Sequence, residues 1–419
     1  MEKALLVTIR LRTEKREWPL EDLAEELEEL VSACGGTVIE NITCVCEKPT
    51  PNFLIGKGKV EELAGMCQGL DVDTVIFSHD LSGTQQRNLE EILGKKTIDR
   101  TQLILDIFSH RAQSPEGKLQ VELAQLQYLL PRLIGQGIIL SRLGGGIGTS
   151  GPGETKLETD RRRIRSRIDK LKDDLKQISL HRDTIRKRRI DNAIPTVALV
   201  GYTHAGKSTL LNALTKAGQV TSENLFTTLD PLSKKLQLEN GENVIISDTV
   251  GFLHNLPHNL VEAFKATLEE VVQADVLVHV LDASNPRVHE YNDAVWEVLK
   301  ELGVEKKPVV TALNKVDLLE DTMWLAQLKN DFVNSVAISA RLNQNLESLL
   351  EKISQHFTSR MVRMEILVSH SRMDLVNLLH REAKIEEIKY LQKNIKIKLI
   401  IPIILSQKLL HNKEIEEVY

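Results

Sequence analysis

Long hydrophobic runs are scarce in this chain of 419 residues, and aromatic residues make up only 4% of it. The longest apolar run, Leu399–Leu405, is far shorter than the roughly 20 residues that a membrane-spanning helix needs. The first residues alternate apolar and polar side chains, a pattern that argues against a secretory signal peptide. These absences predict a cytoplasmic protein without stable membrane insertion.

Cysteine is also rare, with four residues that all lie near the start of the chain: Cys34, Cys44, Cys46 and Cys67. A disulfide framework would connect more of the chain, so reduced thiols are expected. The pair at positions 44 and 46 alone makes a poor metal site. The net charge of −5 does not favour a protein that coats nucleic acid over its whole surface.

What the chain does contain is a succession of α/β patterns. Short β-branched runs alternate with helical periodicity over residues 1–110, which predicts βαβ units and a mostly parallel sheet. Near the other end, Ser371–Ile388 has the spacing of an amphipathic helix, and 394–404 that of a strand broken at Pro402. Residues 358–419 are therefore expected to form a small C-terminal α/β domain.

Two stretches with heptad spacing flank a glycine-rich segment within residues 111–193. Apolar residues recur in steps of four and three in both stretches, which lets two helices pack as an antiparallel hairpin. The first seam holds Leu119, Leu123, Leu126, Leu130 and Leu133, and the second holds Ile164, Ile168, Leu171, Leu175, Ile178 and Ile185. Between them, Gly135–Gly153 has eight glycines in 19 residues.

The second helix of this hairpin is basic, with 14 Lys/Arg against 7 Asp/Glu from Glu154 to Ile190. A long basic probe with a glycine-rich tip suits structured RNA, because phosphates attract arginine. A flexible connector and a solvated charged helix face are the alternatives. The candidate RNA contacts are Arg142, Arg161, Arg162, Arg163 and Arg165.

A phosphate-binding loop is the most specific motif in the chain. The apolar run Thr196–Val200 is followed at once by Gly201-x-x-x-x-Gly206-Lys207-Ser208, the spacing of a P-loop. The backbone N–H groups of such a loop face phosphate oxygens, Lys207 would bridge the β- and γ-phosphates, and the Ser208 hydroxyl would bind Mg²⁺. The loop predicts a nucleoside triphosphate with Mg²⁺.

Motifs further along the chain favour guanine. Asp317, in Asn314-Lys315-Val316-Asp317, can accept hydrogen bonds from the ring N–H and the exocyclic amine of guanine, whereas adenine offers the wrong donor pattern. The loop Ser339–Arg341 is similar to the one whose backbone N–H meets the guanine carbonyl in GTPases. The candidate nucleotide-binding residues are Gly201, Tyr202, Thr203, His204, Ala205, Gly206, Lys207, Ser208, Thr209, Phe226, Thr227, Thr228, Leu229, Asp230, Asp248, Thr249, Val250, Gly251, Asn314, Lys315, Val316, Asp317, Ser339, Ala340 and Arg341.

The expected metal ligands are Ser208, Thr228 and, through water, Asp248. The N–H of Gly251 would reach the γ-phosphate. No catalytic residue is assigned beyond Lys207 as the phosphate clamp.

Four segments together closely resemble the HflX family of GTPases, in the Obg-HflX-like superfamily. They are Leu54–Leu63, Gly144–Ile164, Leu225–Pro231 and Asp248–Phe252, and the likeness covers at least Met1–Phe357. The resemblance implies an N-terminal α/β domain with a helical hairpin, a Ras-like GTPase domain and binding to the large (50S) ribosomal subunit. It also implies that the hairpin tip enters the region of the peptidyl transferase centre, and that the protein splits or rescues stalled ribosomes under stress.

Two positions need comment within this resemblance. Phe252 follows Gly251 where many GTPases carry a glutamine, and a phenyl ring cannot align water by hydrogen bonding. Slow hydrolysis is therefore expected in isolation, with turnover raised by the large subunit.

His204 stands where the family usually has an asparagine associated with a monovalent cation. Imidazole is a poor ligand for potassium, so potassium stimulation is doubtful.

These observations predict an α/β multidomain protein with an N-terminal α/β domain (1–110), a coiled-coil hairpin with a glycine-rich tip (111–193), a P-loop GTPase domain (194–357) and a C-terminal domain (358–419). The expected activity is hydrolysis of GTP to GDP and phosphate by a monomer that associates with the large ribosomal subunit and its rRNA. A ribosome-assembly GTPase acting on free large subunits is the nearest alternative. A metabolic P-loop kinase or ATPase, and an RNA-binding scaffold with a purely structural nucleotide site, are the others.

Overall fold

The computed structural model describes residues 2–13, 18–133, 152–191, 194–215, 232–238, 240–253, 265–410 and 415–417. The chain divides into two compact units, one formed chiefly by residues 1–179 and the other chiefly by residues 180–419. Each unit buries at least one hydrophobic core of its own. Among the described residues, no helix has both the length and the apolar composition to cross a membrane.

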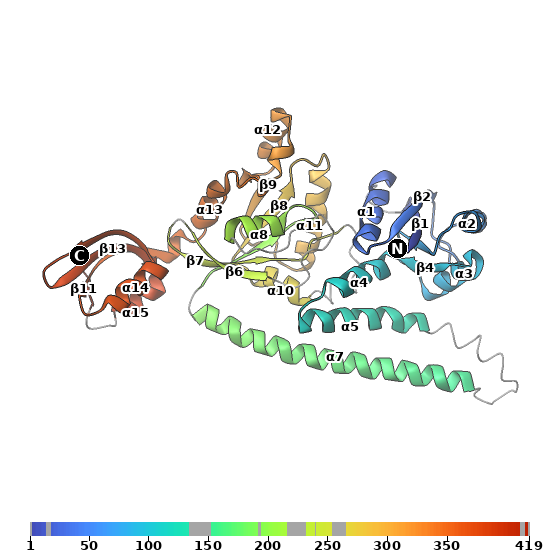
Figure 1. Cartoon of the computed structure of the whole chain (residues 1–419), viewed down its shortest axis with the longest axis horizontal. Helices are drawn as coiled ribbons and strands as arrows, with labels where there is room; N and C mark the ends of the chain where they lie inside the picture. Colours follow the sequence, from blue (N-terminus) through green and yellow to red (C-terminus); the bar gives the residue numbers. More distant parts are fainter. Residues whose placement is uncertain are drawn as a thin grey trace. The chain divides into compact units, whose positions relative to one another are not determined.

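A four-stranded parallel sheet in the order β2-β1-β3-β4 organises the first unit (Figure 1). Strand β1 has neighbours on both sides, and its run Ala4–Ile9 is buried, as expected for a parallel sheet covered on both faces. The elements are β1 (Lys3–Leu11), α1 (Leu20–Ala33), β2 (Thr37–Cys46), α2 (Lys57–Gly69), β3 (Thr74–Phe77), α3 (Gly83–Leu93), β4 (Lys96–Asp99) and α4 (Arg100–Arg111).

The four cysteines of this unit are free thiols. Burial raises the pKa of the Cys34 and Cys44 thiols to about 12, so both are protonated and poorly reactive at neutral pH.

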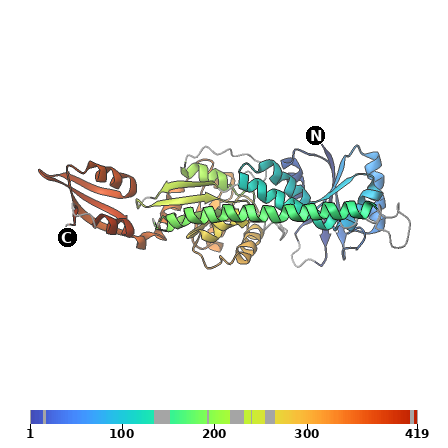
Figure 2. The same ribbon diagram turned by 90° about the horizontal axis from the view of Figure 1, so that it is seen from below.

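Eight of the predicted seam residues pack together between α5 (Pro115–Arg132) and α7 (Pro152–Asp191), which lie side by side in both views (Figures 1 and 2). Helix α5 begins where the Ser114 hydroxyl accepts from the Gly117 N–H, with proline in the first turn. Arg167 donates two hydrogen bonds of 2.7 Å to the carboxylate of Glu122, which fixes the register. The apolar contacts come from Leu119, Leu123, Leu126, Leu130, Ile164, Ile168, Leu171 and Leu175.

A six-stranded sheet in the order β10-β9-β8-β5-β7-β6 forms the main body of the second unit. All of its neighbouring pairs are parallel except β6 with β7. The carboxyl ends of the parallel strands meet at one edge, where ligands bind in folds of this kind. The elements are β5 (Thr196–Val200), α8 (Lys207–Thr215), β6 (Leu232–Gln237), β7 (Asn243–Asp248), α10 (Lys265–Gln273), β8 (Val276–Asp282), α11 (Val288–Glu301), β9 (Val309–Asn314), the 3₁₀ turn η2 (Val316–Leu318), α12 (Thr322–Asp331), β10 (Ser335–Ala337), α13 (Leu346–Gln355) and the 3₁₀ turn η3 (Thr358–Arg360).

The C-terminal part of the second unit is a small antiparallel sheet in the order β12-β13-β11-β14. Its β-α-β-β-α-β sequence of elements is that of a ferredoxin-like fold. The elements are β11 (Met361–Ser369), α14 (Met373–Glu382), β12 (Lys384–Tyr390), β13 (Asn394–Pro402), α15 (Ile403–Leu410) and β14 (Ile415–Glu417).

The prediction of one helix over Ser371–Ile388 was wrong in its second half, because α14 ends at Glu382 and Lys384–Tyr390 is a strand. Ile385 and Ile388 are three residues apart, a helical spacing, yet both pack on the same core. An irregularity in the pairing between Ile385 and Glu387 inserts one residue and restores both isoleucines to one face. The bulge therefore gave this strand an apolar spacing of three residues, which is typical of a helix.

Candidate nucleotide site

The loop Gly201–Ser208 joins the end of β5 to the start of α8, at the carboxyl edge of the six-stranded sheet. Two of its glycines are required by close approaches. A Cβ on Gly201 would lie 2.3 Å from the carbonyl oxygen of Val280, and one on Gly206 would lie 2.3 Å from Nδ2 of Asn314. Gly206 also has a φ of 92°, which side chains other than glycine rarely adopt. The loop can follow this path only because neither residue has a side chain.

Lys207 is buried inside the curve of this loop. Its Nζ donates to the carbonyl oxygens of Gly201 at 3.0 Å and Tyr202 at 2.8 Å. Burial lowers the pKa of the Lys207 amine to about 8, and the negative charge of Asp248 opposes that shift only in part. A phosphate group is a stronger acceptor than a carbonyl, so the amine is placed to exchange these contacts for a nucleotide.

Two of the three expected metal ligands lie together. The Ser208 hydroxyl donates to Oδ2 of Asp248 at 2.6 Å, which joins the first turn of α8 to the end of β7. A hydroxyl and a carboxylate are hard oxygen ligands of the kind that Mg²⁺ prefers. The donor set therefore fits that ion. Thr228, the third expected ligand, lies outside the described residues.

The segment after β7 runs beside the phosphate loop as a short parallel bridge. The Thr203 N–H donates to the Phe252 carbonyl at 2.9 Å, and the Phe252 N–H donates to the Gly201 carbonyl at 3.1 Å. The Phe252 ring is only 2% exposed. A Cβ on Gly251 would meet the Thr203 side chain at 2.8 Å. Phe252 thus anchors this segment through packing and backbone bonds.

Asn314, at the end of β9, connects three of the predicted motifs. Its Nδ2 donates to the Ala205 carbonyl of the phosphate loop at 2.8 Å, and its Oδ1 accepts from the Ala340 N–H at 3.0 Å. The Ala340 N–H therefore braces the loop Ser339–Arg341 against Asn314. One buried amide holds the phosphate loop and the two base-reading segments at fixed distances.

The next residues of this motif present a carboxylate and an ammonium. Oδ1 of Asp317 is buried and has no hydrogen-bond partner among the described residues, so it suits the donors of a guanine edge. The Lys315 Nζ lies 2.6 Å from Oδ2 of Asp282 at the end of β8. Lys315 has a φ of 63°, the left-handed region, at the turn between β9 and η2.

Some predicted site residues cannot be placed. Residues 226–230 lie outside the described part of the chain. His204 is in the phosphate loop with a φ of 60°.

Sequence reasoning missed three neighbours of the site. Tyr291 of α11 stacks on Tyr202 with ring centroids 4.2 Å apart. His279 pairs with Val200 just before the loop, and its pKa falls to about 3, chiefly through burial and also through the charge of Lys207. Asp282 is the third. Its position at the carboxyl end of a buried strand was a signal that could have revealed it.

Comparison with known proteins covers most of the chain. Family models match residues 21–109 (GTP-binding GTPase N-terminal), 111–189 (GTP-binding GTPase Middle Region) and 196–315 (50S ribosome-binding GTPase). The protein named GTPase HflX from Caldanaerobacter subterraneus subsp. tengcongensis is 46% identical over 97% of this chain and 93% of its own length. The chain belongs to the HflX GTPase family. GTPase HflX of Escherichia coli is 42% identical over 86% of this chain and 84% of its own length.

Membership of the HflX family makes the protein a GTP hydrolase with a Ras-like P-loop domain, so the predicted family, enzyme class and fold class are confirmed. A crystal structure of a complex of SsGBP and GDP covers 86% of this chain and 99% of that chain at 27% identity, with a TM-score of 0.47.

The arginines of the hairpin fall into two classes. Arg161 and Arg163 pair with Glu158 and Asp160 on the same helix, at 3.4 and 3.7 Å. Arg162 and Arg165 are exposed and form no ion pair with another described residue. Arg142 lies outside the described residues. Ion pairs within α7 therefore involve only some of these arginines.

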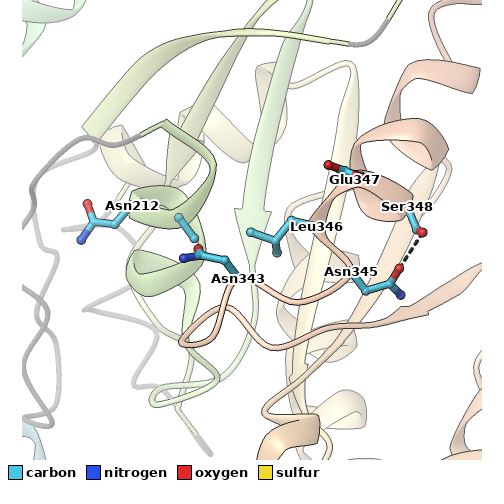
Figure 3. A pocket seen from close by; sticks show the side chains of 7 residues that line it. Asn212, Asn343, Asn345, Leu346, Glu347 and Ser348 are labelled. Carbon is cyan, nitrogen blue, oxygen red and sulfur yellow. Dashed lines mark hydrogen bonds between the residues drawn. The ribbon is translucent and has the colours of Figure 1, made fainter.

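A pocket of about 550 Å³ lies between α8 and the loop that leads into α13 (Figure 3). Asn212 and Ala213 line one side, and residues 343–348, except Gln344, line the other. Ser348 donates to Oδ1 of Asn345 at 2.6 Å on that second side. The pocket contains no residue of the phosphate loop or of the Asn314–Asp317 motif. It is a neighbour of the nucleotide site.

Proposed function

We propose that this HflX GTPase binds GTP through the predicted residues of the phosphate loop and of Asn314–Asp317, with Mg²⁺ held by Ser208 and, through water, by Asp248. The 2.6 Å contact between these two side chains supports the metal site. When bound, Mg²⁺ neutralises charge on the phosphate oxygens and orients them. Thr228 completes the ligand set in this proposal.

Lys207 provides the fixed positive charge for transfer of the γ-phosphate. Its amine leaves the carbonyls of Gly201 and Tyr202 and donates to phosphate oxygens, where it stabilises the negative charge that develops. Phe252 cannot align the attacking water, since its ring is apolar and buried. Hydrolysis is therefore slow until a partner supplies the missing alignment of the water.

That partner, we propose, is the large ribosomal subunit, and the action is the splitting or rescue of stalled ribosomes in the cytoplasm by a monomeric protein. The family description "50S ribosome-binding GTPase" supports the subunit. Arg162 and Arg165, which are exposed and form no ion pair with another described residue, support contact with rRNA, because phosphate attracts guanidinium groups. A role in assembly on free large subunits is the second candidate, favoured by the same observations.

Sedimentation of whole ribosomes with the protein and GTP, or a non-hydrolysable analogue, separates the two roles. Conversion of whole ribosomes to subunits supports splitting. Binding to free large subunits alone, without conversion, supports assembly.

In either case the large subunit should raise GTP turnover by at least about tenfold, a barrier change of about 1.4 kcal/mol. Equal turnover with and without subunits would reject the activation.

The hairpin offers a matched pair of variants for the RNA contact. Arg162→Gln with Arg165→Gln removes two charges that have no ion pair among the described residues, and Arg161→Gln with Arg163→Gln removes two that do. The first pair should weaken subunit binding more and lower the dependence of log affinity on log salt by about 0.7–0.9 per lost contact. Equal effects of the two double substitutions would show that the hairpin acts through its net charge alone.

A further inference from the structure

Asp282 ends β8 beside Asn314, which ends β9, and the two strand ends are joined by several bonds. The strands pair in parallel with Asp282 opposite Asn314, and the Ala283 N–H donates to the Asn314 carbonyl at 2.9 Å. Asp282 is thereby placed next to the base-reading motif although it is distant in sequence.

Both oxygens of the Asp282 carboxylate have specific donors. Oδ1 accepts from the Ser284 N–H at 3.0 Å and from the Ser284 hydroxyl at 2.6 Å, and Oδ2 lies 2.6 Å from the Lys315 Nζ. The Asp282 side chain is 16% exposed, so water screens this pair less than a surface ion pair. The serine sets the orientation of the carboxylate, and the carboxylate sets the position of the ammonium.

The loop that carries Asp282 is itself braced. The Trp324 indole N–H donates to the Ala283 carbonyl at 2.9 Å, and Leu281, Ala283 and Val288 are buried in one cluster. The Arg287 N–H donates to Oδ1 of Asn285 and closes the turn before α11. A carboxylate on so rigid a support can hold a flexible lysine in one conformation.

Lys315 stands two residues before Asp317, whose buried Oδ1 lacks a partner among the described residues. A lysine side chain has an apolar stem of four methylenes that can cover a flat ring once its ammonium is held elsewhere. We propose that Asp282 is a positioning residue for nucleotide recognition: by holding the ammonium of Lys315, it directs the stem of that side chain against the face of the guanine ring whose edge Asp317 reads.

If Asp282 has this role, its substitution should lower affinity only for ligands that carry the guanine base. Asp282→Asn should weaken GDP binding about tenfold, because the unpaired lysine becomes free to sample other rotamers. Binding of ribose 5-diphosphate, which keeps the sugar and phosphates but has no base, should change less than twofold. Isothermal calorimetry with Mg²⁺ on the full chain measures both ligands. A purely structural effect on the fold would weaken both ligands alike.

A double-mutant cycle tests whether Asp282 acts through Lys315. Lys315→Met keeps the apolar stem and removes the charge, so in this background Asp282→Asn should have little further effect on GDP affinity. Ser284→Ala leaves both charges in place and should weaken GDP binding about threefold, which tests the same relay if Asp282→Asn is unstable. Asp331→Asn is the control, since its carboxylate pairs at 3.4 Å with His289, and it should leave affinity unchanged.

Additive losses in Asp282→Asn and Lys315→Met would overturn the proposal, and so would equal losses for GDP and ribose 5-diphosphate.

Discussion

The base end and the phosphate end of the nucleotide site are held in different ways. At the base end, side chains from separate strands join the loops, through Asn314 to Ala205 and Ala340 and through Asp282 to Lys315. At the phosphate end, Lys207 is bonded to carbonyls of its own loop and Ser208 to Asp248. In the binding mode proposed above, the nucleotide leaves the first set of contacts in place and replaces the second. Recognition is thus preorganised at the base, and rearrangement is concentrated at the phosphates.

The largest effect should come from removing the phosphate clamp. Lys207→Ala deletes the one side-chain ammonium inside the loop among the described residues, and should lower kcat for GTP by about a hundredfold to a thousandfold. GDP affinity should fall much less, since the base end is intact. Single-turnover hydrolysis and calorimetry measure the two quantities. A loss of affinity as large as the loss of rate would remove the distinction between the two ends.

Asn314→Ala should have the next largest effect, on binding. It leaves the Ala340 N–H and the Ala205 carbonyl without their common partner, and because the two loops lose this brace, GDP binding should weaken by about a hundredfold. Asn334→Ala, which removes a 2.9 Å bond to the Val309 carbonyl elsewhere in the same sheet, is the matched control. Similar losses of affinity in both variants would mean that Asn314 acts only through stability.

Only the phosphate end should respond to pH near neutrality. The pKa of Lys207 is lowered to about 8 by burial, and phosphate requires the charged amine. Raising the pH from about 6.5 to 8.5 should therefore weaken GDP binding about fourfold through loss of that proton. Lys207→Arg does not titrate in this range, so its affinity should not show this decrease. The same decrease in Lys207→Arg would assign the titration to another group.

The smallest effect should come from the aromatic stack behind the phosphate loop. Tyr291→Leu removes the ring that stacks on Tyr202 at 4.2 Å, a contact worth about 0.5–1.5 kcal/mol, and should weaken GDP binding about threefold. Tyr390→Leu removes an exposed ring in the C-terminal sheet and should have no effect. If Tyr291→Leu also binds GDP normally, the stack supports the fold alone.

Much of the fold followed from local patterns. The phosphate loop was evident because its glycines and lysine are contiguous, and the hairpin seams were evident because α-helical periodicity extends over many residues. The strand Lys384–Tyr390 was mistaken for helix because its bulge produced a spacing of three. The predicted domain boundaries and the roles of the individual site residues stay predictions.

The contacts that complete the site were harder to foresee. Asp282 and Lys315 meet only because β8 and β9 are adjacent in the sheet, and Tyr202 meets Tyr291 only because α11 packs near the loop. No spacing along the chain encodes such pairings. Asp317, by contrast, was named by the motif itself, and its Oδ1 is buried without a hydrogen-bond partner among the described residues.

Calorimetry of Asp317→Asn against GDP and xanthosine diphosphate, with Mg²⁺ present, tests the central claim most directly. The carboxylate should accept from two guanine donors, whereas the amide should match the extra carbonyl of xanthine. The variant should lose affinity for GDP and gain affinity for xanthosine diphosphate, while the phosphate loop still binds the diphosphate. A variant that keeps its preference for GDP, or binds both nucleotides equally weakly, would contradict it.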